Sequence, residues 1–211
     1  MRNLIIYISI LLVLSNCGSL INPRYDNFSS EKKQNYKPLD IKDNYKDVNN
    51  DLTKSDTSFN DNIYGISVVE LNKLLIKSNT KFQLVSFYAY WCKPCLESLP
   101  DIIGIGQDNA NKISLYYITP DNWADINYSK KLLKKYKFNK PSFIIDLDTY
   151  GNEFKPWPRY QNFLNELNKY YKTQDLTTSL PTYLLIKNGN ELVYSVEGKP
   201  NYTKIVELIN E

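Results

Sequence analysis

The chain has 211 residues, of which 42% are hydrophobic, and its formal net charge is +3. So small a net charge gives no support for a nucleic-acid partner. The chain contains 0 histidines, which excludes serine–histidine and cysteine–histidine hydrolases and any histidine base, metal ligand or pH switch.

The N-terminal segment, residues 1–17, predicts export. A short basic start precedes an apolar run at 4–14, which has the length of a signal peptide and is too short for an ordinary membrane-spanning helix. Residues 14–17 (LSNC) follow and resemble the lipobox of bacterial lipoproteins, in which the cysteine, here Cys17, is lipidated and becomes the first residue. Asn16 departs from the usual glycine or alanine, and the alternative is an uncleaved membrane anchor. Both interpretations place the rest of the chain outside the cytoplasm.

Residues 18–62 predict a disordered tether. Asn, Asp, Lys and Ser dominate this segment, and its apolar residues come singly. Such a composition cannot bury enough surface to offset the entropy lost on ordering. An ordered arm is the alternative, because tyrosines recur. Residues 63–211 then have the size of one domain with one core.

Within residues 63–211, strands and helices are expected to alternate. Ser67 and Glu70 have the spacing of a capping box at the start of a helix that runs to about Lys77. Strands are expected at 81–89, 112–118, 142–147, 181–187 and 191–196, and further helices at 92–104, 124–137, 159–171 and 202–210. Asn188-Gly189 is a strong hairpin signal between the last two strands. This order predicts an α/β layered domain.

Two other patterns are interpreted as structural. The basic run at 130–137 has helical spacing, which favours a solvated helix face over a binding patch. Residues 146–151 begin like a calcium loop, but the twelfth position is Trp157 rather than glutamate, so a strand end and turn are expected there.

Cys92 and Cys95 lie just beyond the strand at 81–89, with two residues between them. A zinc site is a poor interpretation, because about four Cys or His ligands are usual and the chain has no histidine and no second cysteine pair. A structural disulfide is also a poor one, because so short a loop removes little chain entropy. We therefore expect a reactive dithiol.

The local sequence favours Cys92 as the nucleophile of this dithiol. It is placed at a helix N-terminus, where unpaired amides and the helix dipole stabilise a thiolate, and Lys93 adds a positive charge beside it. Cys95 lies a turn further in and is expected to be less exposed. It is suited to resolve the mixed disulfide formed by Cys92.

Residues 91–95 (WCKPC) resemble the active site of thioredoxin-fold proteins. The preceding VSFYA at 85–89 resembles their central strand, and 180–182 with the hairpin after it resemble the segment that carries a cis-proline. With the lipobox and a long insert at 119–180, the chain is most similar to the TlpA-like group of membrane-anchored, extracytoplasmic thiol–disulfide oxidoreductases. The resemblance implies a thioredoxin-like fold, a central mixed sheet flanked by helices, with an inserted helix–strand–helix segment.

The resemblance also implies roles for individual residues. Cys92 and Cys95 would be catalytic together with Pro181, whose cis peptide bond would face the cysteines while the adjacent backbone binds substrate as an added strand. An ordinary trans proline opening a strand is the alternative. The supporting residues would be Trp91, Lys93 and Pro94.

The same resemblance implies the partners of the protein. It implies no cofactor and no metal. The partners would be thiols or disulfides of exported proteins, an upstream redox protein, and a membrane reached through the lipid anchor on the periplasmic side or at the cell surface. Reductive roles, including cytochrome c maturation, are common in the group.

Two positions depart from the family pattern. Ser86 stands where thioredoxins carry a buried acid, and Ser98 stands where TlpA-like proteins often carry glutamate. Glu97 is one residue early, roughly 100° around a helix. Glu97 or a water held by Ser86 are weak candidates for the proton acceptor of Cys95.

Two further functions are alternatives to this interpretation. Peroxide reduction is disfavoured, because Val85 and Ala89 occupy positions where peroxiredoxin-type sites place Pro and Thr or Ser. A binding or assembly module with an idle dithiol remains the alternative, slightly favoured by the missing acids and disfavoured by the intact motif at 91–95.

Overall fold

The computed structural model describes residues 39–40, 63–122, 125–138, 140–151, 155–172 and 176–211. The expected signal segment, the lipobox with Cys17, and the expected tether apart from residues 39–40 lie outside this part of the chain. The domain expected from residue 63 onwards is described over most of its length.

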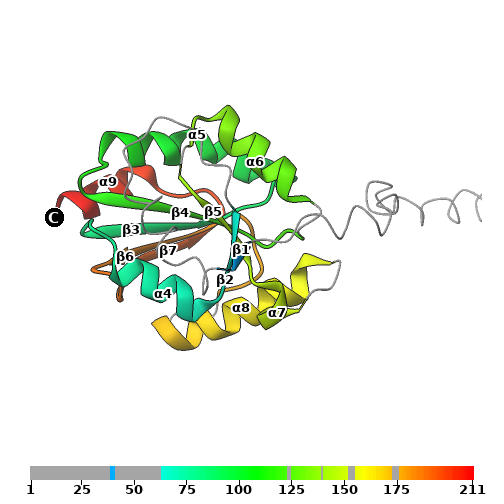
Figure 1. The fold of residues 1–211 in the computed structure, drawn as a ribbon. Helices are drawn as coiled ribbons and strands as arrows, with labels where there is room; N and C mark the ends of the chain where they lie inside the picture. The colour runs from blue at the N-terminus through cyan, green and yellow to red at the C-terminus, as the bar shows by residue number, and fades with distance from the viewer. Residues whose placement is uncertain (1–38, 41–62, 123–124, 139, 152–154, 173–175) are drawn as a thin grey trace, which may run out of the picture. The chain divides into compact units, whose positions relative to one another are not determined.

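A mixed sheet forms the centre of the domain (Figure 1). In the described part of the chain it has seven strands in the order β1-β2-β5-β4-β3-β6-β7. They are β1 (Leu39–Asp40), β2 (Ile63–Ile66), β3 (Phe82–Phe87), β4 (Ile113–Thr119), β5 (Ser142–Ile145), β6 (Thr182–Lys187) and β7 (Glu191–Glu197). Strands β1 to β5 run parallel, whereas β6 and β7 are each antiparallel to the strand before them in the sheet.

Helices cover both faces of this sheet (Figure 1). The described helices are α4 (Val68–Ile76), α5 (Lys93–Asp108), α6 (Ile126–Lys135), α7 (Leu147–Tyr150), α8 (Pro156–Tyr171) and α9 (Tyr202–Asn210). Helices α5, α6 and α9 lie on one face, and α4, α7 and α8 lie on the other. This arrangement confirms the predicted fold class, a central mixed sheet flanked by helices.

Strand β3 supplies side chains to two hydrophobic cores. Phe82 and Leu84 pack in the core beneath α5 and α9, whereas Val85 and Phe87 pack in the core beneath α4 and α8. All six residues of the strand are buried. A strand covered on both faces needs apolar side chains in both directions, which explains the nearly continuous apolar run in the sequence.

The insert expected at 119–180 is built into the sheet. Its strand β5 lies between β2 and β4, with Ile144 paired to Gly65 on one side and to Thr119 on the other. Helix α6 precedes β5, and α7 and α8 follow it. The insert therefore carries part of the core as well as additional surface.

Two expected boundaries in the insert are wrong. The run at 146–151 contains the one-turn helix α7 in place of the expected turn, because the Asp146 carboxylate accepts a hydrogen bond from the Thr149 N–H at 3.0 Å. Helix α8 begins at Pro156 rather than near residue 159. Proline is favoured in a first helical turn, where its missing N–H removes no intrahelical bond.

The hairpin expected at Asn188-Gly189 is present between β6 and β7. Gly189 has φ +77°, and a Cβ atom there would lie 2.4 Å from the Cα of Ile76. Only glycine fits this close approach to the end of α4.

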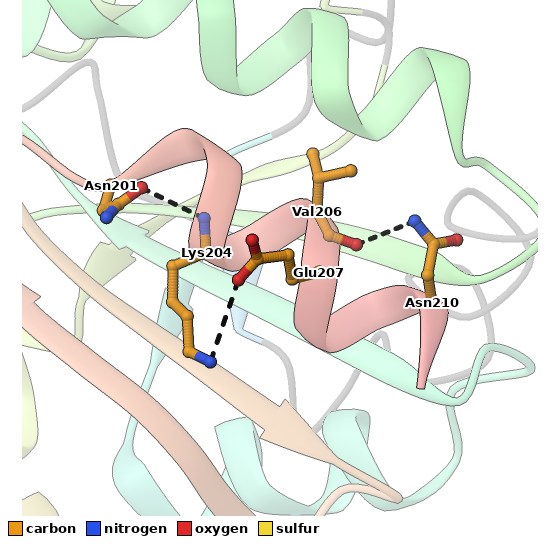
Figure 2. Close-up of polar contacts among 5 residues, drawn as sticks. All are labelled: Asn201, Lys204, Val206, Glu207 and Asn210. Carbon is orange, nitrogen blue, oxygen red and sulfur yellow. Dashed lines mark hydrogen bonds and ion pairs between the residues drawn. The ribbon is translucent and has the colours of Figure 1, made fainter.

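Capping side chains set the starts of α4 and α9. Ser67 and Glu70 form the predicted capping box of α4. Figure 2 shows the corresponding contact in α9, where the Asn201 side chain accepts a hydrogen bond from the Lys204 N–H at 3.0 Å. The exposed Lys204–Glu207 pair, at 3.9 Å, adds little stability. At the other end, the Asn210 amide donates to the Val206 carbonyl at 2.8 Å.

Candidate active site

The cysteine pair lies where the chain passes from β3 into α5. Cys92 is the N-cap of α5, as predicted, and its own N–H donates to the Ala89 carbonyl at 3.1 Å. A disulfide joins Cys92 to Cys95, with the two Cα atoms 5.2 Å apart. The Cys95 N–H points at the Cys92 sulfur over 3.2 Å. The first sulfur therefore occupies the place where a helix N-terminus stabilises negative charge.

Both cysteines are buried in this oxidised state. Cys92 is 6% exposed and Cys95 is 2% exposed. The order is the expected one, but the difference is small. The hydrogen bond from the helix to the Cys92 sulfur distinguishes the two cysteines more clearly than exposure does.

The Trp91 side chain is held by a buried carboxylate. Its indole Nε1–H donates to Asp121 at 2.7 Å, while the Thr119 hydroxyl donates to the other carboxylate oxygen at 2.7 Å. Asp121 is 1% exposed, and Trp91 is 37% exposed. The residue before the cysteine is thus fixed on one side and open to solvent on the other.

Burial raises the pKa of Asp121 to about 6. Hydrogen bonds from Thr119 and Trp91 oppose this rise, and the neighbouring Asp125 carboxylate adds to it. The pKa of Asp125 is also raised by burial, partly offset by a hydrogen bond from the Tyr90 hydroxyl. The carboxylate beside Trp91 therefore changes charge in mildly acidic solution.

We expect the fluorescence of Trp91 to report this titration. The folded protein binds the Asp121 proton near pH 6, whereas the ordinary value is 3.8. As the pH falls through this window the folded state takes up the proton first, so this group adds stability on acidification and costs stability above about pH 6. A fluorescence midpoint near pH 6 should be present in the wild type and absent in both Asp121→Asn and Trp91→Phe. A midpoint near 4, or one that survives in Asp121→Asn, would contradict the assignment.

The insert contacts Trp91 from a second direction. Trp157, in the first turn of α8, meets the Trp91 ring edge-on with centroids 5.5 Å apart. Two residues later, the fully buried Arg159 donates to the Pro120 carbonyl at 2.6 Å, immediately before Asp121. Helix α8 and the segment after β4 thereby form one support for the tryptophan.

Lys93 and Pro94 occupy the first turn of α5, as expected. The Lys93 side chain is exposed, and its ammonium group lies 3.8 Å from the exposed Glu97 carboxylate. The carboxylate therefore partly offsets the positive charge of Lys93, and both groups lie in solvent. Glu97 lies on the outer side of the helix, which argues against it as a proton acceptor for Cys95.

Hydroxyl groups occupy the buried side of α5 behind the cysteines. Ser98 lies 2.6 Å from the Tyr183 hydroxyl, oxygen to oxygen. Ser86 pairs with Tyr183 across β3 and β6. Both departures from the family pattern, Ser86 and Ser98, therefore adjoin the same tyrosine.

The Leu180–Pro181 peptide bond is cis, as predicted. Pro181 directly precedes β6, and its carbonyl accepts a hydrogen bond from the Gly198 N–H at 2.7 Å. Its expected contact with the Cys92 sulfur stays a prediction. Cys17, the expected lipidation site, lies outside the described residues.

Sequence reasoning missed Asp121, Arg159 and Tyr183. A signal for Asp121 was available, because β3 and β4 are parallel and residues just beyond their carboxyl ends meet at one edge of a sheet. Trp91 and Asp121 both follow those ends. The sequence offered no comparable signal for Arg159, since the hydrogen-bond acceptors that the described residues supply to it are backbone carbonyls.

The described residues contain no group of three or more His, Cys, Asp or Glu side chains placed to hold a metal ion. Among the helices of that part of the chain, none combines the length and apolar character needed to span a membrane.

Similar chain paths occur among solved structures. A thioredoxin-family thiol:disulfide interchange protein from Chlorobium tepidum has 16% identity and a TM-score of 0.47, over 63% of this chain and 79% of that one. An exposed lipoprotein thioredoxin from Streptococcus pneumoniae has 18% identity and a TM-score of 0.43, over 64% and 88%. A secreted disulfide oxidoreductase from Mycobacterium tuberculosis has 14% identity and a TM-score of 0.42, over 62% and 81%.

No protein-family model and no curated protein matches the sequence. Similarity at the level of these solved structures does not transfer an activity or a substrate to this chain.

Proposed function

We propose that the protein is a thiol–disulfide oxidoreductase in which Cys92 attacks and Cys95 resolves. The observation that supports this most directly is the position of Cys92 as the N-cap of α5, with the Cys95 N–H 3.2 Å from its sulfur and a disulfide joining the pair. A thiolate at Cys92 would receive this N–H and the positive end of the helix dipole, which lowers the pKa of a thiol.

The reaction proceeds by two sulfur exchanges. The Cys92 thiolate attacks a disulfide in a partner protein, forms a mixed disulfide and releases one partner sulfur as a thiolate. Cys95 then attacks the Cys92 sulfur and releases the second partner sulfur. The partner gains two electrons and two protons, and the Cys92–Cys95 pair loses them. The reverse sequence oxidises a dithiol partner.

The substrates that we propose are exported proteins. The N-terminal residues support this, since residues 1–17 have the features of a lipoprotein signal ending at Cys17. In this proposal the backbone beside Pro181 binds an extended substrate segment as an added strand. The reductive direction, with cytochrome c maturation among the candidate roles, rests on the sequence resemblance to TlpA-like proteins, as does the need for an upstream redox partner.

Reduction of a protein disulfide such as that of insulin tests the activity. With a dithiol reductant as electron source, the wild type should accelerate reduction well above the rate of the reductant alone. Cys92→Ser should return the rate to that background, because the attacking thiolate is gone. A wild-type rate equal to the background would favour the binding-module alternative.

Mass spectrometry of the mature N-terminus tests the anchor. We expect a chain that begins at a lipidated Cys17, because the apolar segment at 4–14 ends in a lipobox-like sequence. The variant Cys17→Ala should lose the lipid and remain unprocessed. An intact Met1, or cleavage elsewhere with Cys17 unmodified, would show that this part of the proposal is wrong.

A further inference from the structure

A buried serine one helical turn beyond Cys95 contacts the buried hydroxyl of a tyrosine on strand β6. Ser98 is 3% exposed and lies on the buried side of α5, and Tyr183 on β6 is 2% exposed. Their oxygens are 2.6 Å apart, which is a short hydrogen bond between neutral groups. This contact joins the helix that carries the dithiol to the strand that follows Pro181.

The number of hydroxyl protons decides which group donates in the hydrogen bond between Ser98 and Tyr183. The Ser98 oxygen lies 2.9 Å from the Pro94 carbonyl and 3.2 Å from the Cys95 carbonyl, and Ser98 has one proton to donate. While that proton is on a carbonyl, the Tyr183 hydroxyl must be the donor to Ser98. Ser98 is thus held by Tyr183 and can rotate its own O–H between the carbonyls of Pro94 and Cys95.

Tyr183 is suited to remain a neutral donor. Burial raises its pKa to about 12, opposed by hydrogen bonds with Ser98 and Ser86. It therefore keeps its proton at any physiological pH and cannot act as a base. The pair can orient a hydrogen bond, and it adds no charge of its own.

We propose that Ser98, positioned by Tyr183, turns its O–H from the backbone to the Cys95 sulfur in the reduced protein and stabilises the Cys95 thiolate during resolution. This inference rests on the proposed function. Ser98 and Tyr183 would then be positioning residues for the second sulfur exchange, in a site where serine stands at both positions expected for an acid.

The step needs such help because Cys95 is buried. Burial in apolar surroundings disfavours a thiolate, so an unassisted Cys95 would stay protonated. With the hydrogen bond in place, the Cys95 thiol loses its proton and its sulfur attacks Cys92. The Cys92–substrate disulfide breaks, and the proton given up by the Cys95 thiol ends on the departing substrate thiolate, so protons and electrons balance.

Other titratable groups face Tyr183 from the elements around it. These groups are the phenols of Tyr117 on β4 and Tyr202 on α9. The pKa of each phenol is raised, chiefly by burial. Asp101 lies beyond Tyr202 on the exposed side of α5. Cys92 and Cys95 complete the set in the same core.

Stopped-flow reaction of the reduced protein with an aromatic disulfide that releases a coloured thiolate tests the proposal. The first equivalent of colour reports attack by Cys92, and the second reports resolution by Cys95. The informative variants are Ser98→Ala and Tyr183→Phe. Tyr117→Phe is the matched control, because it removes a phenol hydroxyl from the same core and that hydroxyl has no hydrogen-bond partner among the described residues.

Both variants should slow the second phase and leave the first unchanged. Losing a hydrogen bond to a charged group shifts the thiol equilibrium about 10-fold to 100-fold. The more basic thiolate is also the better nucleophile, with a Brønsted slope of ~0.5, so resolution should be about 3-fold to 10-fold slower at neutral pH. Above the thiol pKa the variants should equal or exceed the wild-type rate, and Tyr117→Phe should follow the wild type throughout.

Three outcomes would overturn the inference. Resolution at the wild-type rate in both variants would show that the hydroxyl pair is not used. A defect that persists at high pH, or one shared equally by Tyr117→Phe, would indicate a packing effect. If the wild type gives no first phase at all, the proposed function itself fails, which is a distinguishable result.

Discussion

The Cys95→Ser protein should accumulate mixed disulfides with its partner proteins, whereas the Cys92→Ser protein should form almost none. Removing Cys95 stops the reaction after attack, because no second thiol remains to release the partner. Removing Cys92 takes away the sulfur at the helix N-terminus. Adducts are read as bands on a non-reducing gel that collapse when a reductant is added.

We expect the two variants to differ because Cys92 lies at the helix N-terminus, and the solvent exposure of the two cysteines plays little part. The two cysteines differ by only a few per cent in exposure, 6% against 2%. Only the Cys92 sulfur accepts the N–H of the first helical turn among the hydrogen bonds of the described residues. A thiolate is therefore stabilised at Cys92, and the buried Cys95 thiol is expected to stay protonated until a neighbour assists it.

The double variant Cys92→Ser/Cys95→Ser is the control for this experiment. It should give no adduct, because Cys17 would be the remaining cysteine and is expected to carry lipid. Adducts through Cys95 in the Cys92→Ser protein would reverse the assigned order of attack. Adducts in neither single variant would favour a binding module with an idle dithiol.

The elements of this domain that the sequence predicted well share a local cause. The capping box at Ser67 and the hairpin at Asn188-Gly189 depend on a few adjacent residues, and both are present. The position of β5 inside the sheet depends on pairing with β2 and β4, more than twenty residues away in the chain. Periodicity predicts a strand but does not specify its neighbours.

In the candidate site, too, the features set by adjacent residues were predicted and those set by long-range packing were not. The motif at 91–95 located Cys92 at a helix N-terminus, since strand and helix signals flank it directly. Three other residues are distant from this motif in the sequence, and the fold alone brings them near it: Asp121, Arg159 and Tyr183. Tyr183 is reached because β6 lies beside β3 in a register that pairs it with Ser86. That register is set by long-range packing.

The insert at 119–180 contacts the cysteine motif. Its residues approach the cysteine motif at Trp91, through the Asp121 carboxylate and through the ring of Trp157. A side chain fixed on two sides loses rotamer freedom before any substrate arrives, so less entropy is lost on binding. The exposed part of Trp91 is then a pre-ordered surface beside Cys92, the proposed nucleophile.

Arg159 should be the residue on which this arrangement depends most. Its guanidinium donates to the Pro120 carbonyl at 2.6 Å and to the Gly151 carbonyl at 3.2 Å, and the side chain is fully buried. Hydrogen bonds from a charged donor contribute about 1.5 to 3 kcal/mol each, so Arg159→Met should lower the free energy of unfolding by about 3 to 6 kcal/mol. Arg159→Lys should recover only part of this loss, because an ammonium group lacks the planar fork that spans two acceptors.

Denaturant unfolding followed by tryptophan fluorescence measures both consequences of the Arg159 substitutions. The midpoint should move to lower denaturant, and the Trp91 signal that titrates with Asp121 should weaken, since Pro120 precedes Asp121 and would be released. Lys169→Met is the matched control, because it removes a positive charge from an exposed position on the same helix and should change stability by less than about 0.5 kcal/mol. If Arg159→Met were as stable as Lys169→Met, the buried guanidinium would not be the anchor of the insert, and the support of Trp91 would have to come from Trp157 alone.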